Sequence, residues 1–111
     1  MDVSLIIPTY NGSEKILGCL DSLQKQTFLP KEIIVVIDGS TDNTVQILNE
    51  YKSTVDIKII NQHNQGRAKA RNNGAKLAQN DCLIFTDDDM ILDEHCIEYH
   101  VSSIEQNPDD L

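Results

Sequence analysis

The sequence has few of the features that mark secreted or membrane-spanning proteins. It has only three cysteines, Cys19, Cys82 and Cys96, and no CxxC pair or Cys/His spacing of a zinc site. We therefore expect free or buried thiols in a reducing cytoplasm. No apolar run approaches the roughly 20 residues that cross a bilayer. No basic segment precedes the first apolar run, as it would in a signal peptide.

Basic residues are also scarce. Nine Lys and Arg stand against 18 Asp and Glu, which gives a formal net charge of −9. A field of this sign repels polyphosphate unless a metal or a local cluster of cations intervenes, which argues against nucleic acid as a partner. Hydrophobic residues make up 40% of the 111 residues, as in a globular domain. We expect one domain or part of one.

Four short apolar runs predict β-strands. Ile33–Ile37 consists entirely of Ile and Val, and together with Val3–Ile7 it suits strands that are buried on both faces of a parallel sheet. Cys82–Phe85 is a similar run. Ile57–Ile60 is interrupted by a lysine, and we expect this strand nearer an edge of the sheet.

Helical periodicity follows each of these runs. Apolar residues recur at helical spacing in Ile16–Leu23, Val45–Tyr51, Ala68–Ala78 and Cys96–Ile104. Asn11 or Ser13 could cap the first helix. The third is rich in alanine and could pack closely on the sheet. The strict alternation predicts an α/β fold with a doubly wound, mostly parallel sheet and helices on both faces.

Polar sequence follows three of the four expected strands, where ligands of open parallel sheets bind. The segments are Pro8–Gly12, Asp38–Asp42 and Asp87–Asp89. A strand-end carboxylate at Asp38 could accept hydrogen bonds from a base or a ribose, and Tyr10 could stack on a base. Turn formation, helix capping and a half-buried loop tyrosine are the alternative explanations.

Three adjacent aspartates repel one another, and a hard divalent cation relieves that repulsion. In an extended segment Asp87 and Asp89 would point the same way, so we expect both to ligate a metal. A solvated acidic turn is the alternative. Arg67 and Arg71 lie on one face at the start of the third helix, where a diphosphate could bind. A solvated basic face explains them equally well.

Four ordered segments resemble family-2 glycosyltransferases of the GT-A, Rossmann-like fold. They are VSLIIPTYNG, EIIVVIDGSTDNT, NQGRAKARNNGAKLAQ and CLIFTDDDM, and the likeness covers residues 3 to about 100. The resemblance implies binding of a nucleotide-diphosphate sugar, usually a UDP-sugar, and transfer to an acceptor hydroxyl with inversion. In polysaccharide biosynthesis the acceptor would be a saccharide or a lipid-linked glycan.

The resemblance also implies roles for particular residues. The expected nucleotide-binding residues are Pro8, Thr9, Tyr10, Asp38, Arg67, Arg71, Asp87 and Asp88. Asp38 would bond the base. Asp87–Asp89 matches the family's DxD motif, so Asp87 and Asp89 would hold Mg²⁺ or Mn²⁺ against the diphosphate. The family commonly has a second acid before this Asp-Gly-Ser, where this chain has Ile37.

The catalytic base and most of the acceptor site of such enzymes lie downstream of the DxD motif. We therefore expect residues 1–111 to be the donor-binding part of a longer enzyme, with the base beyond Leu111. That enzyme would act in the cytoplasm or at the inner face of the membrane. The sequence does not identify the sugar, the linkage or the oligomeric state.

Two other functions remain open from the sequence. The segment LIFTDDDMIL also resembles haloacid dehalogenase-type phosphatases, with Asp87 as nucleophile and Asp89 as general acid. Such enzymes need a later lysine, and the residues after Asp89 contain none. Alternatively, the chain could be a non-catalytic module that binds a nucleotide without turnover.

Overall fold

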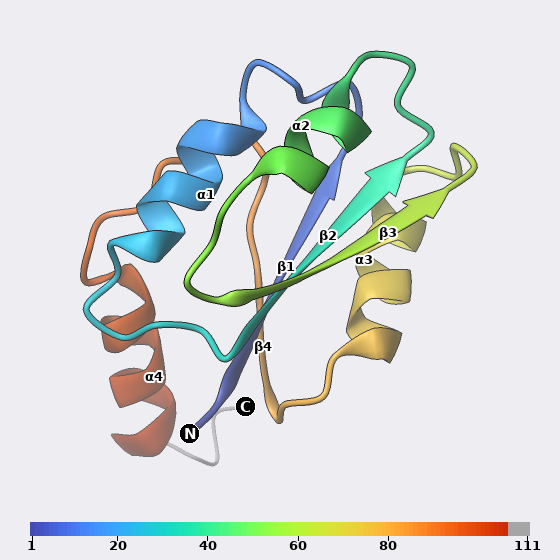
Figure 1. The fold of residues 1–111 in the computed structure, drawn as a ribbon. Coiled ribbons are helices and arrows are strands. Elements are labelled where there is room, and N and C mark those ends of the chain that lie inside the picture. The colour runs from blue at the N-terminus through green and yellow to red at the C-terminus, as the bar shows by residue number, and fades with distance from the viewer. Residues whose placement is uncertain (107–111) are drawn as a thin grey trace.

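A computed structural model describes residues 1–106 of the chain. Four strands and four helices alternate along it. Their order is β1 (Val3–Thr9), α1 (Ile16–Gln24), β2 (Glu32–Asp38), α2 (Thr44–Glu50), β3 (Asp56–Gln62), α3 (Arg67–Leu77), β4 (Cys82–Phe85) and α4 (Cys96–Gln106). The strands form one parallel sheet in the order β3-β2-β1-β4 (Figure 1). Within these residues, none of the helices has both the length and the apolar character to cross a bilayer.

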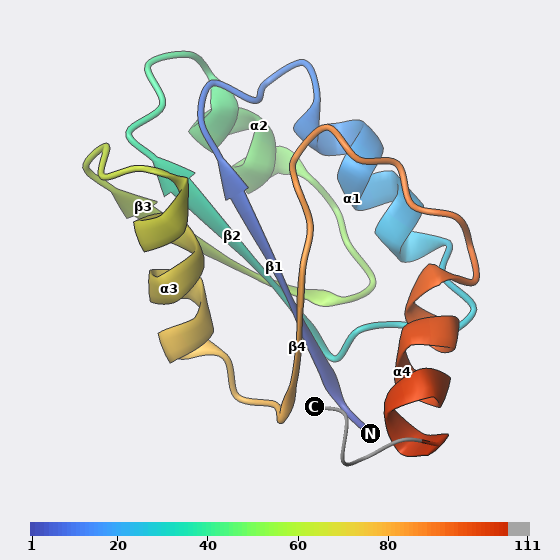
Figure 2. The same cartoon turned by 180° about the vertical axis from the view of Figure 1, so that it is seen from behind.

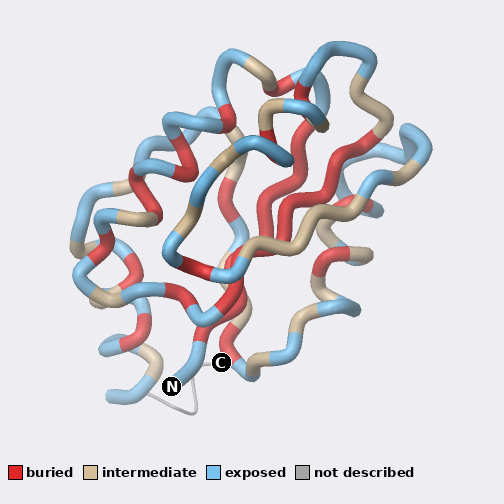
Figure 3. Tube along the Cα trace, in the orientation of Figure 1, coloured by how far each residue is buried: buried red, intermediate tan, exposed pale blue. Residues whose placement is uncertain are grey.

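The position of each strand explains its composition. β1 and β2 lie in the middle of the sheet and are buried along their whole length (Figure 3), which requires continuous apolar sequence. β3 is an edge strand whose residues are only half-buried or exposed, so it tolerates Lys58. The expectation that this third strand lies near an edge is confirmed.

Helices cover both faces of the sheet, as predicted. α1, α2 and α4 pack on one face and α3 packs alone on the other (Figures 1 and 2). Alternate residues of a strand point to opposite faces. Leu5 and Ile7 of β1 therefore join Leu20 of α1 and Ile97 of α4 in the larger core, whereas Ile6 packs on the side of α3.

The contact between α3 and the sheet depends on small residues. Ala70 is fully buried in the smaller core, one turn before the buried Gly74. A Cβ atom at Gly74 would lie 2.6 Å from Cγ2 of Ile6 and 3.1 Å from Cγ2 of Val36. The helix therefore approaches β1 and β2 more closely than any residue with a side chain would allow, as the alanine-rich sequence indicates.

A buried carboxylate joins several segments at the amino edge of the sheet. Glu32, at the start of β2, is only 3% exposed. It accepts hydrogen bonds from Ser4 Oγ (2.5 Å), from the Gln79 backbone N–H (2.7 Å) and from Asn80 Nδ2 (3.1 Å), and it pairs with Lys58 Nζ at 2.8 Å. Burial alone would raise the pKa of Glu32, but these donors outweigh it and lower the pKa from 4.5 to about 2.

We predict that Glu32→Gln destabilises the fold and removes part of its acid sensitivity. The amide keeps the size of the side chain but loses the charge, so the free energy of unfolding at neutral pH should fall by about 1–3 kcal/mol. Because the folded-state pKa is lowered, the stabilisation by ionised Glu32 is complete above pH 4.5 and is lost as the pH falls towards 2. Urea unfolding across this pH range measures both effects.

Glu50→Gln is the matched control, because Glu50 is exposed and accepts one hydrogen bond, from Gln46 Nε2 at 3.4 Å. It should follow the wild-type pH dependence. Equal losses of stability in wild type and Glu32→Gln through the acid range would contradict the role of Glu32.

Candidate functional site

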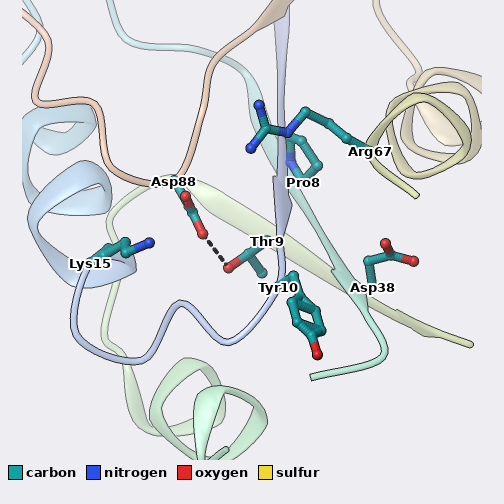
Figure 4. A pocket seen from close by; sticks show the side chains of 7 residues that line it. All are labelled: Pro8, Thr9, Tyr10, Lys15, Asp38, Arg67 and Asp88. Carbon is teal, nitrogen blue, oxygen red and sulfur yellow. Dashed lines mark hydrogen bonds between the residues drawn. The ribbon is translucent and has the colours of Figure 1, made fainter. Parts of the chain in front are cut away.

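The four parallel strands place their carboxyl ends at one edge of the sheet, and a pocket lies there (Figure 4). Its lining residues are Pro8, Thr9, Tyr10, Lys15, Asp38, Arg67 and Asp88. Six of these seven are among the nucleotide-binding residues expected from the sequence. The cavity has a volume of about 210 Å³. This is below the range of about 300–1,000 Å³ that holds a whole small ligand, so these residues form one part of a site.

A hydrogen bond joins two lining residues of the pocket, one at the end of β1 and one in the loop after β4. Thr9 Oγ1 donates to Asp88 Oδ2 at 2.8 Å (Figure 4). Gly12 leaves room for this bond, since a Cβ atom there would collide with Thr9 Oγ1 and lie 2.6 Å from Asp88 Oδ2. The carbonyl of Gly12 also accepts the backbone N–H groups of Lys15 and Ile16, at 3.0 and 2.9 Å, at the start of α1.

The three adjacent aspartates have different surroundings. Asp87 Oδ1 lies 3.2 Å from Arg71 Nη2 and 3.7 Å from Arg67 Nη1, whereas Asp88 binds Thr9. Asp89 is exposed and has no hydrogen bond or ion pair to any residue in 1–106. The chain turns at Asp88 and Asp89 and is not extended there, so the alternation that would align Asp87 with Asp89 does not apply.

A divalent metal would therefore find carboxylates here but no complete protein cage. In residues 1–106 no three His, Cys, Asp or Glu side chains come together as a metal-binding group. Mg²⁺ commonly takes only one or two carboxylates and completes its shell with water and phosphate oxygens. The exposed carboxylate of Asp89 and the half-exposed one of Asp87 fit that kind of shared coordination.

Asp38 is the most constrained residue of the pocket. It is 5% exposed, and its carboxylate accepts from Gln62 Nε2 (3.0 Å) and from the backbone N–H groups of Gln65 (2.8 Å) and Gly66 (3.0 Å). Burial alone would raise the pKa of Asp38, but these three donors lower it. The carboxylate is therefore ionised at neutral pH, so it can accept hydrogen bonds but not donate them.

Asn11 ties the loop after β1 to the loop after β2. Its backbone has a φ of 49°, which few non-glycine residues adopt. Its Oδ1 accepts the backbone N–H groups of Thr41 (2.7 Å) and Asp42 (3.3 Å), and its own N–H donates to Ser40 Oγ at 2.9 Å. The expectation that Asn11 or Ser13 caps α1 is wrong, because the N-cap position is Lys15 and no side chain bonds there.

Two cations border the pocket from opposite sides. Lys15 enters from the start of α1 and Arg67 from the start of α3 (Figure 4). Lys15 was missed at the sequence level, because a single lysine before a helix has no distinctive pattern. Arg71 does not line the pocket, but it pairs with Asp87, the neighbour of the lining residue Asp88. The buried Nε of Arg71 has no hydrogen-bond partner in residues 1–106. The pocket thus has two cations, Lys15 and Arg67, beside the carboxylates of Asp38 and Asp88.

We predict that Gly12→Ala destabilises the protein by about 1–3 kcal/mol, because the methyl group displaces the Thr9–Asp88 pair. Chemical denaturation measures the change. Gly18→Ala is the matched control: a Cβ atom there lies 3.7 Å from Ile91 Cδ1, in ordinary contact, so this helical site should gain up to about 1 kcal/mol. If Gly12→Ala is as stable as the wild type, the loop accommodates the methyl group and the prediction is wrong.

Comparison with known proteins identifies the family. Residues 4–111 match the family model described as glycosyl transferase family 2. The chain is 34% identical over 107 residues to poly-beta-1,6-N-acetyl-D-glucosamine synthase of Staphylococcus epidermidis, covering 96% of this chain and 26% of that protein. It is 37% identical over 110 residues to the uncharacterized glycosyltransferase EpsJ of Bacillus subtilis, covering 98% of this chain and 32% of that protein.

Solved structures of such enzymes share the fold. The S. aureus TarS fragment 1–349 in complex with UDP-GlcNAc superposes with a TM-score of 0.87 at 35% identity, covering 96% of this chain and 32% of that one. Mannosyltransferase PcManGT from Pyrobaculum calidifontis, in complex with GDP-Man and Mn²⁺, gives 0.85 at 25% identity, covering 92% and 32%. The α/β architecture expected for GT-A is thus confirmed, and the chain spans about a third or less of the length of these relatives. It belongs to glycosyl transferase family 2.

Proposed function

We propose that this chain is the donor-binding part of a glycosyltransferase that transfers a sugar from a UDP-sugar to an acceptor hydroxyl with inversion. One observation carries the proposal: the pocket at the carboxyl edge joins an aromatic ring, a buried ionised carboxylate and cations beside an acidic loop. The S. aureus TarS fragment, which shares the fold, binds UDP-GlcNAc. The assignment of uridine rests on that neighbour and on the sequence motifs.

The base would occupy the part of the pocket formed by β1 and β2. Pro8 and Thr9 form its wall, and Tyr10, which is 49% exposed, offers a ring face for stacking. Asp38 would accept an N–H group of the base. The hydrogen bonds of Asn11 to Ser40 and Thr41 support this arrangement, because they hold the segment after Tyr10 against the loop after β2.

The diphosphate would lie between the start of α1 and the start of α3. Lys15 and Arg67 supply positive charge there, and the N-terminus of α3 adds its partial charge. Asp87 holds Arg67 and Arg71 beside this region. Asp88, in the loop after β4, would also contact the nucleotide, and the hydrogen bond from Thr9 holds its carboxylate in place.

Asp89, together with Asp87, would hold Mg²⁺ or Mn²⁺ against the diphosphate. The complex of PcManGT with GDP-Man and Mn²⁺, a structure with the same fold, supports a divalent metal at this site. When bound, such a metal neutralises the charge that develops on the departing diphosphate. The chain's own contribution is to present Asp89 unpaired and exposed, so that a metal and phosphate oxygens can reach it.

The second half of the reaction would depend on residues beyond Leu111. A downstream carboxylate would take the proton of the acceptor hydroxyl, whose oxygen attacks the anomeric carbon opposite the diphosphate. The bond from that carbon to the diphosphate oxygen breaks, and the nucleoside diphosphate leaves. A saccharide or lipid-linked acceptor, with action in the cytoplasm or at the inner face of the membrane, belongs to the same proposal.

The alternatives predict different behaviour. A phosphatase using Asp87 as nucleophile is disfavoured by the family match over residues 4–111, and Asp87 is engaged by two arginines. A non-catalytic nucleotide-binding module would bind the nucleotide without sugar transfer in any longer form of the chain. Turnover by the full-length protein distinguishes it from the transferase.

We predict that the protein binds UDP in a Mn²⁺-dependent manner and that Asp89→Ala weakens this binding at least about tenfold, the loss of one charge-assisted contact. Calorimetric titration of UDP, GDP, ADP and dTDP, with and without Mn²⁺, measures the affinities. Asp56→Ala is the matched control, since exposed Asp56 lies at the opposite edge of the sheet. Metal-independent binding, or full affinity in Asp89→Ala, would contradict the assignment of Asp89.

A further inference from the structure

A relay of two amide side chains connects α3 to Asp38. Asn73 Nδ2 donates to Gln62 Oε1 at 2.6 Å, and Gln62 Nε2 donates to Asp38 Oδ1 at 3.0 Å. The relay therefore runs from α3 through the end of β3 to the end of β2. Both amides are half-buried, and neither lines the pocket.

The relay and two backbone N–H groups together determine how much of the Asp38 carboxylate remains for a ligand. A carboxylate has about four acceptor positions, two on each oxygen. Gln62 and the Gln65 backbone N–H occupy both positions of Oδ1, and the Gly66 backbone N–H occupies one of Oδ2. One acceptor position, on Oδ2, is left in a residue that lines the pocket.

Asp38 and Asn73 together hold the Gln62 amide in one orientation, because the ionised carboxylate can only accept and Asn73 donates to the other end. A glutamine amide presents donors from its nitrogen and acceptors from its oxygen, and the two ends have nearly the same shape. Because Asn73 donates to Oε1, the Gln62 nitrogen is directed to the carboxylate. The reverse orientation would set two acceptors against each other at Asp38 and two donors against each other at Asn73.

We propose that Gln62, oriented by Asn73, is a positioning residue for base recognition, which fixes Asp38 so that Oδ2 offers one acceptor position to one N–H donor. The inference rests on the proposed function and specifies how its donor is chosen. Uracil has a single imide N–H, at N3, between two carbonyl groups, and suits one acceptor. Guanine presents adjacent donors at N1 and N2, which pair best with a carboxylate whose two oxygens are both free.

N3-methyl-UDP is the probe for this contact, because it keeps the ring, the ribose and the diphosphate and carries a methyl group in place of the N3 donor. Calorimetric titration with Mn²⁺ compares it with UDP on wild type, Gln62→Met and Asn73→Ala. Methionine matches the length of glutamine but cannot donate to Asp38. Gln46→Met is the matched control, on the exposed side of α2.

Wild type should bind UDP at least about tenfold more tightly than N3-methyl-UDP, the value of one hydrogen bond to a charged group. Gln62→Met should lose most of this preference: its affinity for UDP falls while that for N3-methyl-UDP is unchanged. Asn73→Ala should show a smaller loss in the same direction, and Gln46→Met should behave as wild type. Thermal denaturation reports whether each variant is folded. If Gln62→Met is not folded, the preference of Asn73→Ala for UDP over N3-methyl-UDP tests the proposal.

Three results would overturn the proposal. If the variants keep the wild-type preference for UDP, the relay does not position Asp38, although UDP binding itself stands. If UDP and N3-methyl-UDP weaken equally, the relay supports the site in general and not the contact with the base. If folded wild type binds neither nucleotide, the proposed function fails and this inference fails with it.

Discussion

The pairing of β1 with strands on both sides is the constraint on which the rest of the structure depends. β1 lies parallel to β2 in a register that opposes Ile6 and Ile34, and parallel to β4 in a register that opposes Ile6 and Phe85. Parallel pairing sends all the strands out of the core in one direction. Residues that are far apart in the sequence, such as Thr9 and Asp88, therefore come within hydrogen-bond distance at that edge.

Two carboxylates on β2 show how the same strand serves structure at one end and, in the proposed function, ligand binding at the other. Glu32 and Asp38 are both buried, and hydrogen bonds lower the pKa of both. Glu32 has a lysine partner and joins segments at the amino edge. Asp38 has no cationic partner among residues 1–106; it organises the segment from Gln62 to Gly66 and keeps one acceptor position on Oδ2. A buried anion stabilised only by neutral donors is suited to select another neutral donor.

The fold could be predicted almost completely from the sequence, because strand burial and helix amphipathicity impose local patterns. Runs such as Ile33–Ile37, made of Ile and Val alone, suit a strand that is buried on both faces, and β2 is such a strand. Pocket residues at the carboxyl end of a strand, such as Asp38, were also predicted, since topology alone places them. Lys15 and Gln62 were not, because their part depends on loop path and side-chain orientation. The same limit explains why the turn at Asp88 and Asp89 and the pairing of Asp87 with arginines were missed.

The close seat of α3 on the sheet has a consequence for how related chains can diversify. Gly74 and Ala70 let the backbone of this helix lie directly on the side chains of Ile6 and Val36, so the helix cannot shift outward or inward without a clash or a void. The distance between Arg67 at the start of α3 and Asp38 at the end of β2 is therefore set by the backbone. Changes in donor preference would then come from side chains in the loops and at the ends of the strands, or from polar positions of α3 such as Asn73, while the positions of α3 that face the sheet stay restricted to the smallest residues.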